Sequence, residues 1–248
     1  MAIFSLAFFF PFSQVVQAQS FTSESEKAIL IELYTSQGCS SCPPAEAYLN
    51  TFKQNSLLWK KYIPLALHVD YWDYLGWKDR FASAENTARQ RQYAKVNSQH
   101  TIYTPGFFVN GRPWRRSFYH RSPEVEKQDV GILKINLQGQ KVKASFSPVA
   151  SLPMSDSPVS NSGETLILNV AITGMGLKTE IEAGEREGSH TRHEFILLNR
   201  TQHKSSNLNW TLQLPRFDKK GAHQLALIAW VSKQNDPGPI QAVGGYIK

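Results

Sequence analysis

The pattern of hydrophobic and polar positions divides the chain into two parts, and the first part carries the longer elements. Apolar, β-branched runs over residues 28–34 and 62–69 are typical of buried strands. Between them, Pro43 and Pro44 open a segment of helix-forming residues that we expect to end near Asn55. The order of strand, helix and strand predicts a parallel unit with a right-handed crossover.

The rest of the first part predicts one more helix and a hairpin. Ser83 is a typical N-cap for a largely polar helix over residues 84–96, which would cover one face of the sheet. Residues 107–109 then lead into Asn110 and Gly111, which is the pattern of a β-hairpin with a type I′ turn.

The second part changes to short alternating runs, which are typical of an antiparallel sheet. A stretch rich in serine and proline, 151–163, is interpreted as a loop within it, and the boundary falls near residues 122–130. We therefore expect an α/β domain over residues 24–125, followed by an all-β sandwich-like domain over residues 130–248. The predicted strands of the second domain cover residues 133–137, 142–146, 165–172, 178–182, 193–199, 208–212, 224–231 and 240–247.

The N-terminal residues have the pattern of a signal peptide. An apolar stretch over residues 2–12 precedes Val16 and Ala18, which fit cleavage after Ala18, so residues 1–18 would be removed. A membrane anchor is the alternative, but Pro11 interrupts the stretch, and about 20 apolar residues are needed to span a bilayer. We expect an exported protein, periplasmic or secreted, without stable membrane insertion.

The charge of the chain bears on its partners. The formal net charge is +7 at pH 7, but the Lys and Arg residues are scattered. No helix-turn-helix, RNP or zinc-finger pattern accompanies them, so we expect no nucleic-acid partner. A solvated basic face explains the charge, and a surface for an anionic partner is the alternative.

The only two cysteines, Cys39 and Cys42, lie between the first predicted strand and the first predicted helix. They fall in the first turn of that helix, where free backbone N–H groups and the helix dipole favour a thiolate. Cys39, which we expect to be the more exposed, is the natural nucleophile, and Cys42 is the natural resolving thiol. An inert disulfide or half of a metal site are the alternatives, although a loop this short stabilises weakly and no second cysteine pair completes a zinc site.

A polar and aromatic segment follows the second strand. Parallel sheets place their chemistry at the carboxyl ends of the strands, so residues 70–79 should emerge beside Cys39. The aromatic side chains of this segment would cap the site, and Asp70 or Asp73 would accept a proton. Ordinary packing under a long loop is the alternative.

Four motifs carry a resemblance to a known family. They begin at Glu32 (ELYTSQGCSSCPPA), His68 (HVDYWDYLGWKD), Thr87 (TARQRQY) and Tyr103 (YTP), and they run in order over residues 30–111. In these motifs the chain resembles the exported thioredoxin-like family catalogued as domain of unknown function 1223. The resemblance implies a thioredoxin-like α/β domain, bacterial export and a β-rich C-terminal domain.

The same resemblance implies roles for single residues. Cys39, Cys42 and Pro105 fall on the redox pair and the cis-proline of thioredoxin-like proteins, and Thr104 with Pro105 would form the wall against which a partner's backbone lies. Glu32 lies on the strand before the cysteines and should be buried, because both faces of a parallel sheet are covered. It resembles the buried acid that takes the resolving cysteine's proton, and a carboxylate paired with an N–H group, Lys or Arg is the alternative.

We therefore expect a thiol–disulfide oxidoreductase that acts on protein or small-molecule thiols and disulfides, with neither a cofactor nor a resident metal. Its predicted site consists of Cys39, Cys42, Thr104, Pro105 and Glu32. One rival is a module that binds or delivers Cu(I) through Cys39, Cys42 and His68, and another is a binding protein on a thioredoxin-like scaffold. His190 and His193 are also metal-ligating types, but without a nearby carboxylate cluster they are more typical of a turn and a strand.

Overall fold

The computed structural model describes residues 17–115, 122–152 and 165–248, and the predicted signal peptide lies almost entirely outside these ranges. The described residues form two α-helices, three short 3-10 helices and fourteen strands. The helices are α1 (Pro43–Thr51), α2 (Ala84–Val96), η1 (Phe52–Gln54), η2 (Asp73–Leu75) and η3 (Gly184–Arg186). The strands are β1 (Gln19–Thr22), β2 (Ile29–Thr35), β3 (Tyr62–His68), β4 (Gly106–Val109), β5 (Arg112–Pro113), β6 (Gly131–Gln138), β7 (Lys141–Pro148), β8 (Leu166–Met175), β9 (Leu177–Glu180), β10 (His190–His193), β11 (Ile196–Ser205), β12 (Asn209–Gln213), β13 (Gln224–Lys233) and β14 (Pro239–Ile247).

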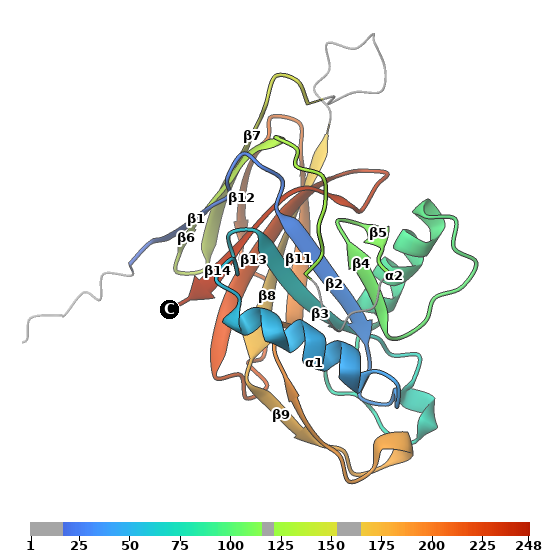
Figure 1. Cartoon of the computed structure of the whole chain (residues 1–248). Coiled ribbons are helices and arrows are strands. Elements are labelled where there is room, and N and C mark those ends of the chain that lie inside the picture. Colours follow the sequence, from blue (N-terminus) through green and yellow to red (C-terminus); the bar gives the residue numbers. More distant parts are fainter. Residues whose placement is uncertain (1–16, 116–121, 153–164) are drawn as a thin grey trace, which may run out of the picture.

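Eight of these strands form one mixed sheet in the order β14-β13-β8-β11-β3-β2-β4-β5 (Figure 1). Strand β2 runs parallel to β3 and antiparallel to β4. The other edge of β3 pairs in parallel with β11, where the N–H of Ala66 donates to the carbonyl of Phe195 at 2.9 Å. Strands β8, β13 and β14 extend the sheet beyond β11 by antiparallel pairing.

This arrangement shows that the expected fold class was wrong. We predicted an α/β thioredoxin-like domain followed by an all-β sandwich-like domain, but the described chain is mostly strand, with two α-helices beside large sheets. The large sheet draws strands from both sides of the expected boundary, because β11 pairs with the free edge of β3. Sequence patterns favour pairing between neighbouring strands, and this contact joins strands that lie far apart in the chain.

A second layer covers part of the large sheet. Strands β1, β6, β7 and β12 form a four-stranded antiparallel sheet, and the buried side chains of β6, β7 and β12 pack against those of β8, β13 and β14. Alternation along β6 buries Leu133, Ile135 and Leu137 and leaves the intervening side chains more exposed. Strands β9 and β10 form a separate two-stranded ribbon.

Local elements of the first part follow the sequence pattern closely. The polar helix α2 begins after Ser83, whose hydroxyl accepts a hydrogen bond from the backbone N–H of Asn86 at 3.2 Å. Strands β4 and β5 form the expected hairpin, and Asn110 (φ 47°) and Gly111 (φ 79°) both adopt the positive φ that a type I′ turn requires. These predictions are confirmed.

The two α-helices cover opposite faces of the sheet. Helix α1 buries Ala45 and Leu49 against the core formed with Ile31 and Leu33 of β2. Helix α2 buries mainly polar side chains, some of which bind backbone carbonyls. Asn86 donates to the carbonyl of His68 at 2.9 Å, and Gln90 donates to the carbonyl of Tyr103 at 2.7 Å.

A buried ion pair attaches α2 to β2. Arg89 Nε lies 2.7 Å from Glu32 Oε1, and Arg89 Nη2 donates to Glu32 Oε2 at 3.2 Å and to the Tyr93 hydroxyl at 2.6 Å. The Tyr93 hydroxyl in turn donates to Glu32 Oε2 at 2.5 Å. Both side chains of the pair are almost fully buried, at 2% and 0% exposure. Glu32 is therefore buried as expected, and it is paired.

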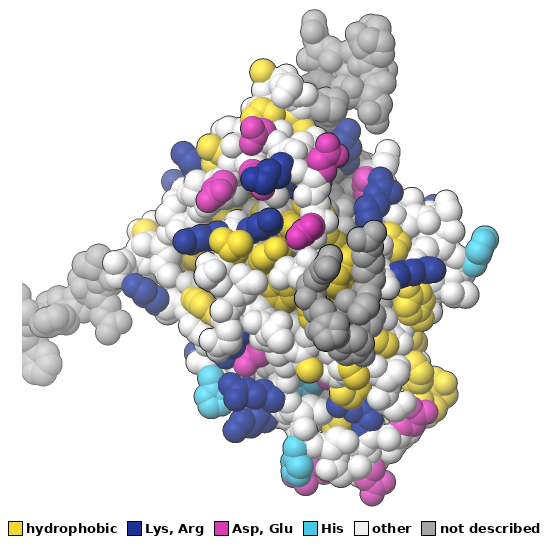
Figure 2. Space-filling model, in the orientation of Figure 1, with side chains coloured by type: hydrophobic (Ala, Val, Ile, Leu, Met, Phe, Trp, Pro, Cys, Tyr) yellow, Lys and Arg dark blue, Asp and Glu magenta, His cyan; other side chains and the backbone are white. Residues whose placement is uncertain are grey.

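The surface shows no single charged face in the view of Figure 2, where Lys and Arg side chains are interspersed with Asp and Glu. No helix within the described ranges is both long enough and apolar enough to cross a membrane.

Replacing Arg89 with Met should lower the free energy of unfolding by about 3–5 kcal/mol, because it leaves the Glu32 carboxylate buried without its partner. Urea denaturation measures this loss. The double variant Glu32→Gln/Arg89→Met removes both charges and should recover much of the stability. Equal losses in the single and double variants would contradict an electrostatic origin.

Candidate functional site

Cys39 and Cys42 form a disulfide at the start of α1. Cys42 is the N-cap residue, and its carbonyl accepts a hydrogen bond from the N–H of Glu46 at 3.1 Å, which places these two residues one helical turn apart. Both cysteines are 0% exposed. Our expectation that Cys39 is the more exposed of the two is therefore wrong, because neighbouring loops cover the turn.

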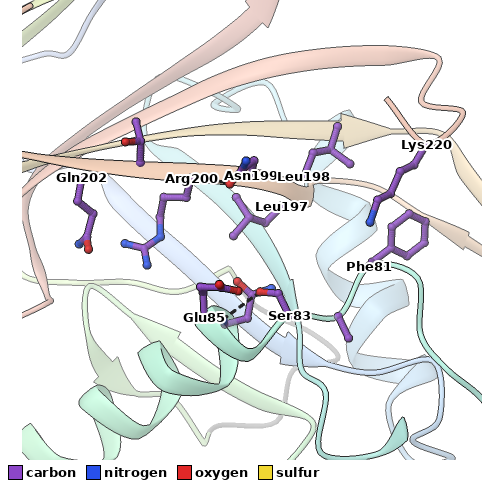
Figure 3. Close-up of a pocket in the computed structure, with 12 residues that line it drawn as sticks. Phe81, Ser83, Glu85, Leu197, Leu198, Asn199, Arg200, Gln202 and Lys220 are labelled. Atoms are coloured by element: carbon purple, nitrogen blue, oxygen red, sulfur yellow. Dashed lines mark hydrogen bonds between the residues drawn. The ribbon is translucent and has the colours of Figure 1, made fainter. Parts of the chain in front are cut away.

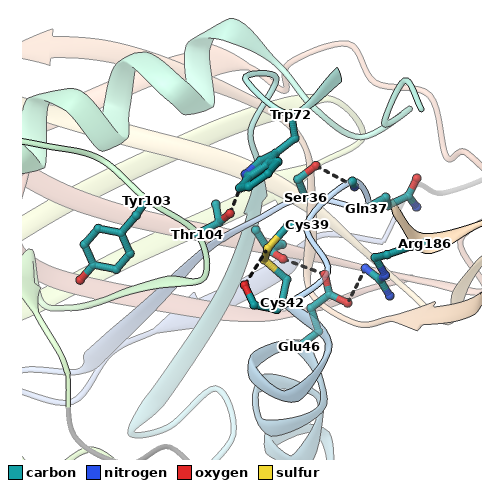
Figure 4. Close-up of a disulfide and its surroundings, with 12 residues drawn as sticks. Ser36, Gln37, Cys39, Cys42, Glu46, Trp72, Tyr103, Thr104 and Arg186 are labelled. Atoms are coloured by element: carbon teal, nitrogen blue, oxygen red, sulfur yellow. Dashed lines mark hydrogen bonds and ion pairs between the residues drawn. A yellow bond between two sulfur atoms is a disulfide. The ribbon is translucent and has the colours of Figure 1, made fainter. Parts of the chain in front are cut away.

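Two loops cover the disulfide on one side (Figure 4). The Thr104–Pro105 peptide bond is cis, as the resemblance implied. The indole N–H of Trp72 donates to the Thr104 hydroxyl at 2.7 Å, so the aromatic segment and the proline loop are joined. Trp72 also lies against Gly38, where an added Cβ would come within 3.2 Å of the Trp72 Cβ. A larger residue at position 38 would therefore displace this cover.

The structure brings Thr104 and Pro105 to the disulfide, but it places Glu32 elsewhere. Glu32 points toward α2, whereas the cysteines begin α1 on the opposite face of the sheet. The buried acid on the side of the cysteines is Glu46, which accepts a hydrogen bond from the Thr35 hydroxyl at 2.7 Å. Its position four residues after Cys42 is the signal that the sequence carried, because residues four apart share a helix face.

A second buried carboxylate holds His68. Asp79 Oδ2 lies 2.5 Å from His68 Nδ1, and Asp79 also accepts the backbone N–H groups of Gln37 at 2.8 Å and Phe81 at 2.9 Å. Burial acts against a charged His68, but the charge and hydrogen bond of Asp79 outweigh it and raise the pKa of His68. Burial would raise the pKa of Asp79, and the contact with His68 instead holds that pKa below its usual value.

His193 and Arg186 complete a buried polar cluster around Glu46. His193 Nδ1 and Arg186 Nη1 each lie 3.8 Å from Glu46 Oε2. Burial, together with the neighbouring His68, lowers the pKa of His193 to about 3, so its ring is neutral. The ligand-type atoms of Glu46, His68 and His193 all lie within 4.8 Å of one another. Sequence patterns did not reveal this cluster, because its members come from distant segments.

The two aspartates considered as proton acceptors serve the surrounding loop. Asp70 Oδ1 accepts the hydroxyl of Thr87 at 2.6 Å, and Asp73 Oδ1 accepts the backbone N–H of Asp79 at 3.2 Å. Burial raises the pKa of Asp73. Both carboxylates therefore help to fix the segment that carries Trp72 and Asp79.

A separate pocket of about 450 Å³ lies between the start of α2 and β11 (Figure 3). Ser83 and Glu85 line it from the helix side, and Arg200 and Gln202 line it from the strand. None of the predicted site residues is among the described residues that line this pocket. The disulfide and the polar cluster are therefore the stronger candidate site.

Comparison with known proteins identifies a family and a related fold. No curated protein matches the sequence. Protein AGR_C_4864 from Agrobacterium tumefaciens has a similar crystal structure, with a TM-score of 0.58 and 22% identity, over 90% of this chain and 94% of that chain. HBP35 of Porphyromonas gingivalis matches with a TM-score of 0.48 and 12% identity, over 91% of this chain and 76% of that chain.

The first of these likenesses shows a shared fold and nothing about activity. The family described as protein of unknown function (DUF1223) matches residues 30–232, well beyond the motifs that carried the resemblance. The family prediction is confirmed, and the chain belongs to the DUF1223 family of proteins of unknown function.

Proposed function

We propose that the protein is a thiol–disulfide oxidoreductase that uses Cys39 and Cys42. The observation that carries this proposal is the disulfide at the N-terminus of α1, beside the cis-Pro105 loop. Unpaired N–H groups at a helix N-terminus stabilise a thiolate, and a thiolate is both the attacking and the leaving group of disulfide exchange.

The exchange runs in two balanced steps. In the reduced protein the Cys39 thiolate attacks one sulfur of a partner disulfide, and the partner's other sulfur leaves as a thiolate. The Cys42 thiolate then attacks the Cys39 sulfur, which forms the intramolecular disulfide and releases the partner's second thiolate. The reverse sequence oxidises a partner dithiol, and the reduction potential of the pair sets the direction.

Both cysteines are buried, so the exchange requires that a partner first gain access to Cys39. A partner cannot reach Cys39 while Trp72 and Thr104 cover the turn, so the cover has to move before exchange. The hydrogen bond between Trp72 and Thr104 opposes this movement. We propose protein or small-molecule thiols and disulfides as partners, in an exported compartment, where a disulfide persists.

Cys42→Ser should accumulate mixed disulfides through Cys39 when the variant is produced in an oxidising compartment, because the resolving thiol is absent. Non-reducing electrophoresis and mass spectrometry measure the adducts. The double variant Cys39→Ser/Cys42→Ser is the control and should form none. If the single variant also forms none while the wild-type protein is fully oxidised, the disulfide is an inert one.

Trp72→Phe should speed the reduction of the disulfide by dithiothreitol about fivefold, because it removes a hydrogen bond worth about 1 kcal/mol that holds the cover closed. The rate is measured by quenching with an alkylating agent and counting the free thiols. Tyr74→Phe is a matched control on the same segment, since Tyr74 is 79% exposed. Equal rates in wild type and Trp72→Phe would show that this contact does not limit access.

A further inference from the structure

A buried polar cluster beside the dithiol plays no part in the proposed exchange. Glu46 of α1, His68 of β3 and His193 of β10 offer three ligand-type atoms within 4.8 Å of one another, and all three residues are buried. They reach the cluster from three separate elements. Burying polar side chains costs free energy, so the convergence of these three residues needs a physical explanation.

Two atoms in this cluster have no hydrogen-bond partner among the described residues. They are Nε2 of His68 and Nη1 of Arg186, and both are shielded from solvent. A buried polar atom without a hydrogen bond destabilises the folded state unless a ligand satisfies it. Nε2 of His68 can accept a proton or a metal ion, and Nη1 of Arg186 can donate a hydrogen bond to an anionic or neutral oxygen.

The groups around the histidines match those that support metal ligands. A metal-binding histidine usually has its second ring nitrogen bound to a carboxylate or another polar group, which fixes the ring. Asp79 binds Nδ1 of His68 in this way and leaves Nε2 free. On His193, the side chain of Gln37 contacts Nε2 at 3.4 Å, and Nδ1 faces Glu46.

We propose that Glu46, His68 and His193 bind a divalent transition-metal ion, with zinc as the best fit. Two imidazoles and one carboxylate are a donor set that zinc uses with water in the fourth position. Ligand atoms of a tetrahedral zinc site lie about 3.3 Å apart, so atoms that now lie up to 4.8 Å apart have to close by up to about 1.5 Å on binding. Arg186 Nη1 then donates to the oxygen in the fourth position.

The charges of the cluster balance such an ion. Glu46 and Asp79 are acidic, Arg186 is basic, and the ring of His193 is neutral. Asp79 at Nδ1 and Glu46 on the other side place two carboxylates around His68, and a metal ion on Nε2 would supply a positive charge between them. The charges of the two carboxylates, Arg186 and the ion sum to +1, and a hydroxide in the fourth position would bring the total to zero.

The site is tested by titrating the metal-free protein with zinc in a chelator-buffered solution and measuring the heat of binding by calorimetry. The wild-type protein should bind one zinc ion per chain, and Glu46→Gln and His193→Gln should each weaken binding more than 100-fold. Asp79→Asn should weaken it about 10–100-fold, as expected for a group that orients a ligand. His190→Gln is the matched control, because His190 lies exposed on the same strand as His193, and it should bind as the wild type does.

Cobalt replaces zinc as a spectroscopic probe that needs no variant. Bound Co²⁺ should give the visible absorption of a tetrahedral site without the near-ultraviolet band of sulfur-to-cobalt charge transfer. The variant Cys39→Ser/Cys42→Ser should bind zinc with unchanged affinity. Zinc binding is therefore tested independently of the proposed thiol–disulfide exchange. The proposal is overturned by a sulfur band, by loss of binding in that serine variant, or by the absence of saturable binding to the wild type.

Discussion

The parallel contact between β3 and β11 is the constraint on which the candidate site depends. It holds the end of β3 beside the start of β11, and it thereby brings His68 next to His193, with ring centroids 5.2 Å apart. The pairing of β2 with β3 sets Thr35 opposite His68, and Thr35 in turn binds Glu46. Two strand registers therefore assemble a polar cluster whose members are scattered along the chain.

Local structure could be predicted from the sequence, because it depends on residues that are close together. The pattern around Ser83 predicted α2, and the pattern around Asn110 and Gly111 predicted the hairpin. The order of strands in the large sheet could not be predicted, because nothing in the sequence of β11 indicates that it pairs with the free edge of β3. The fold class was wrong for this reason, although nearly every strand was expected close to its observed position.

The candidate site shows the same division. The position of Cys39 and Cys42 at the start of a helix followed from flanking residues, and so did the place of Pro105 before a strand. The sequence did not indicate which buried acid lies on the side of the cysteines. Strand alternation correctly indicated that Glu32 is buried, but alternation does not say which face carries α1, and Glu46 is the acid on that face. Likewise, Glu194 follows His193 directly in the sequence, but the carboxylate that faces its ring is Glu46 of α1.

Helix α2 illustrates how directional contacts differ from apolar ones in what they permit. Apolar contacts tolerate a small displacement better than hydrogen bonds do, because the hydrophobic effect is not directional. Helix α2 is held instead by Asn86, Arg89 and Gln90, each bonded to a different segment. Hydrogen bonds weaken steeply when they are misaligned, so a small displacement breaks several at once. A shift of α2 therefore costs several hydrogen bonds at once, and because Gln90 binds the carbonyl of Tyr103, it would also displace the loop that ends in Pro105.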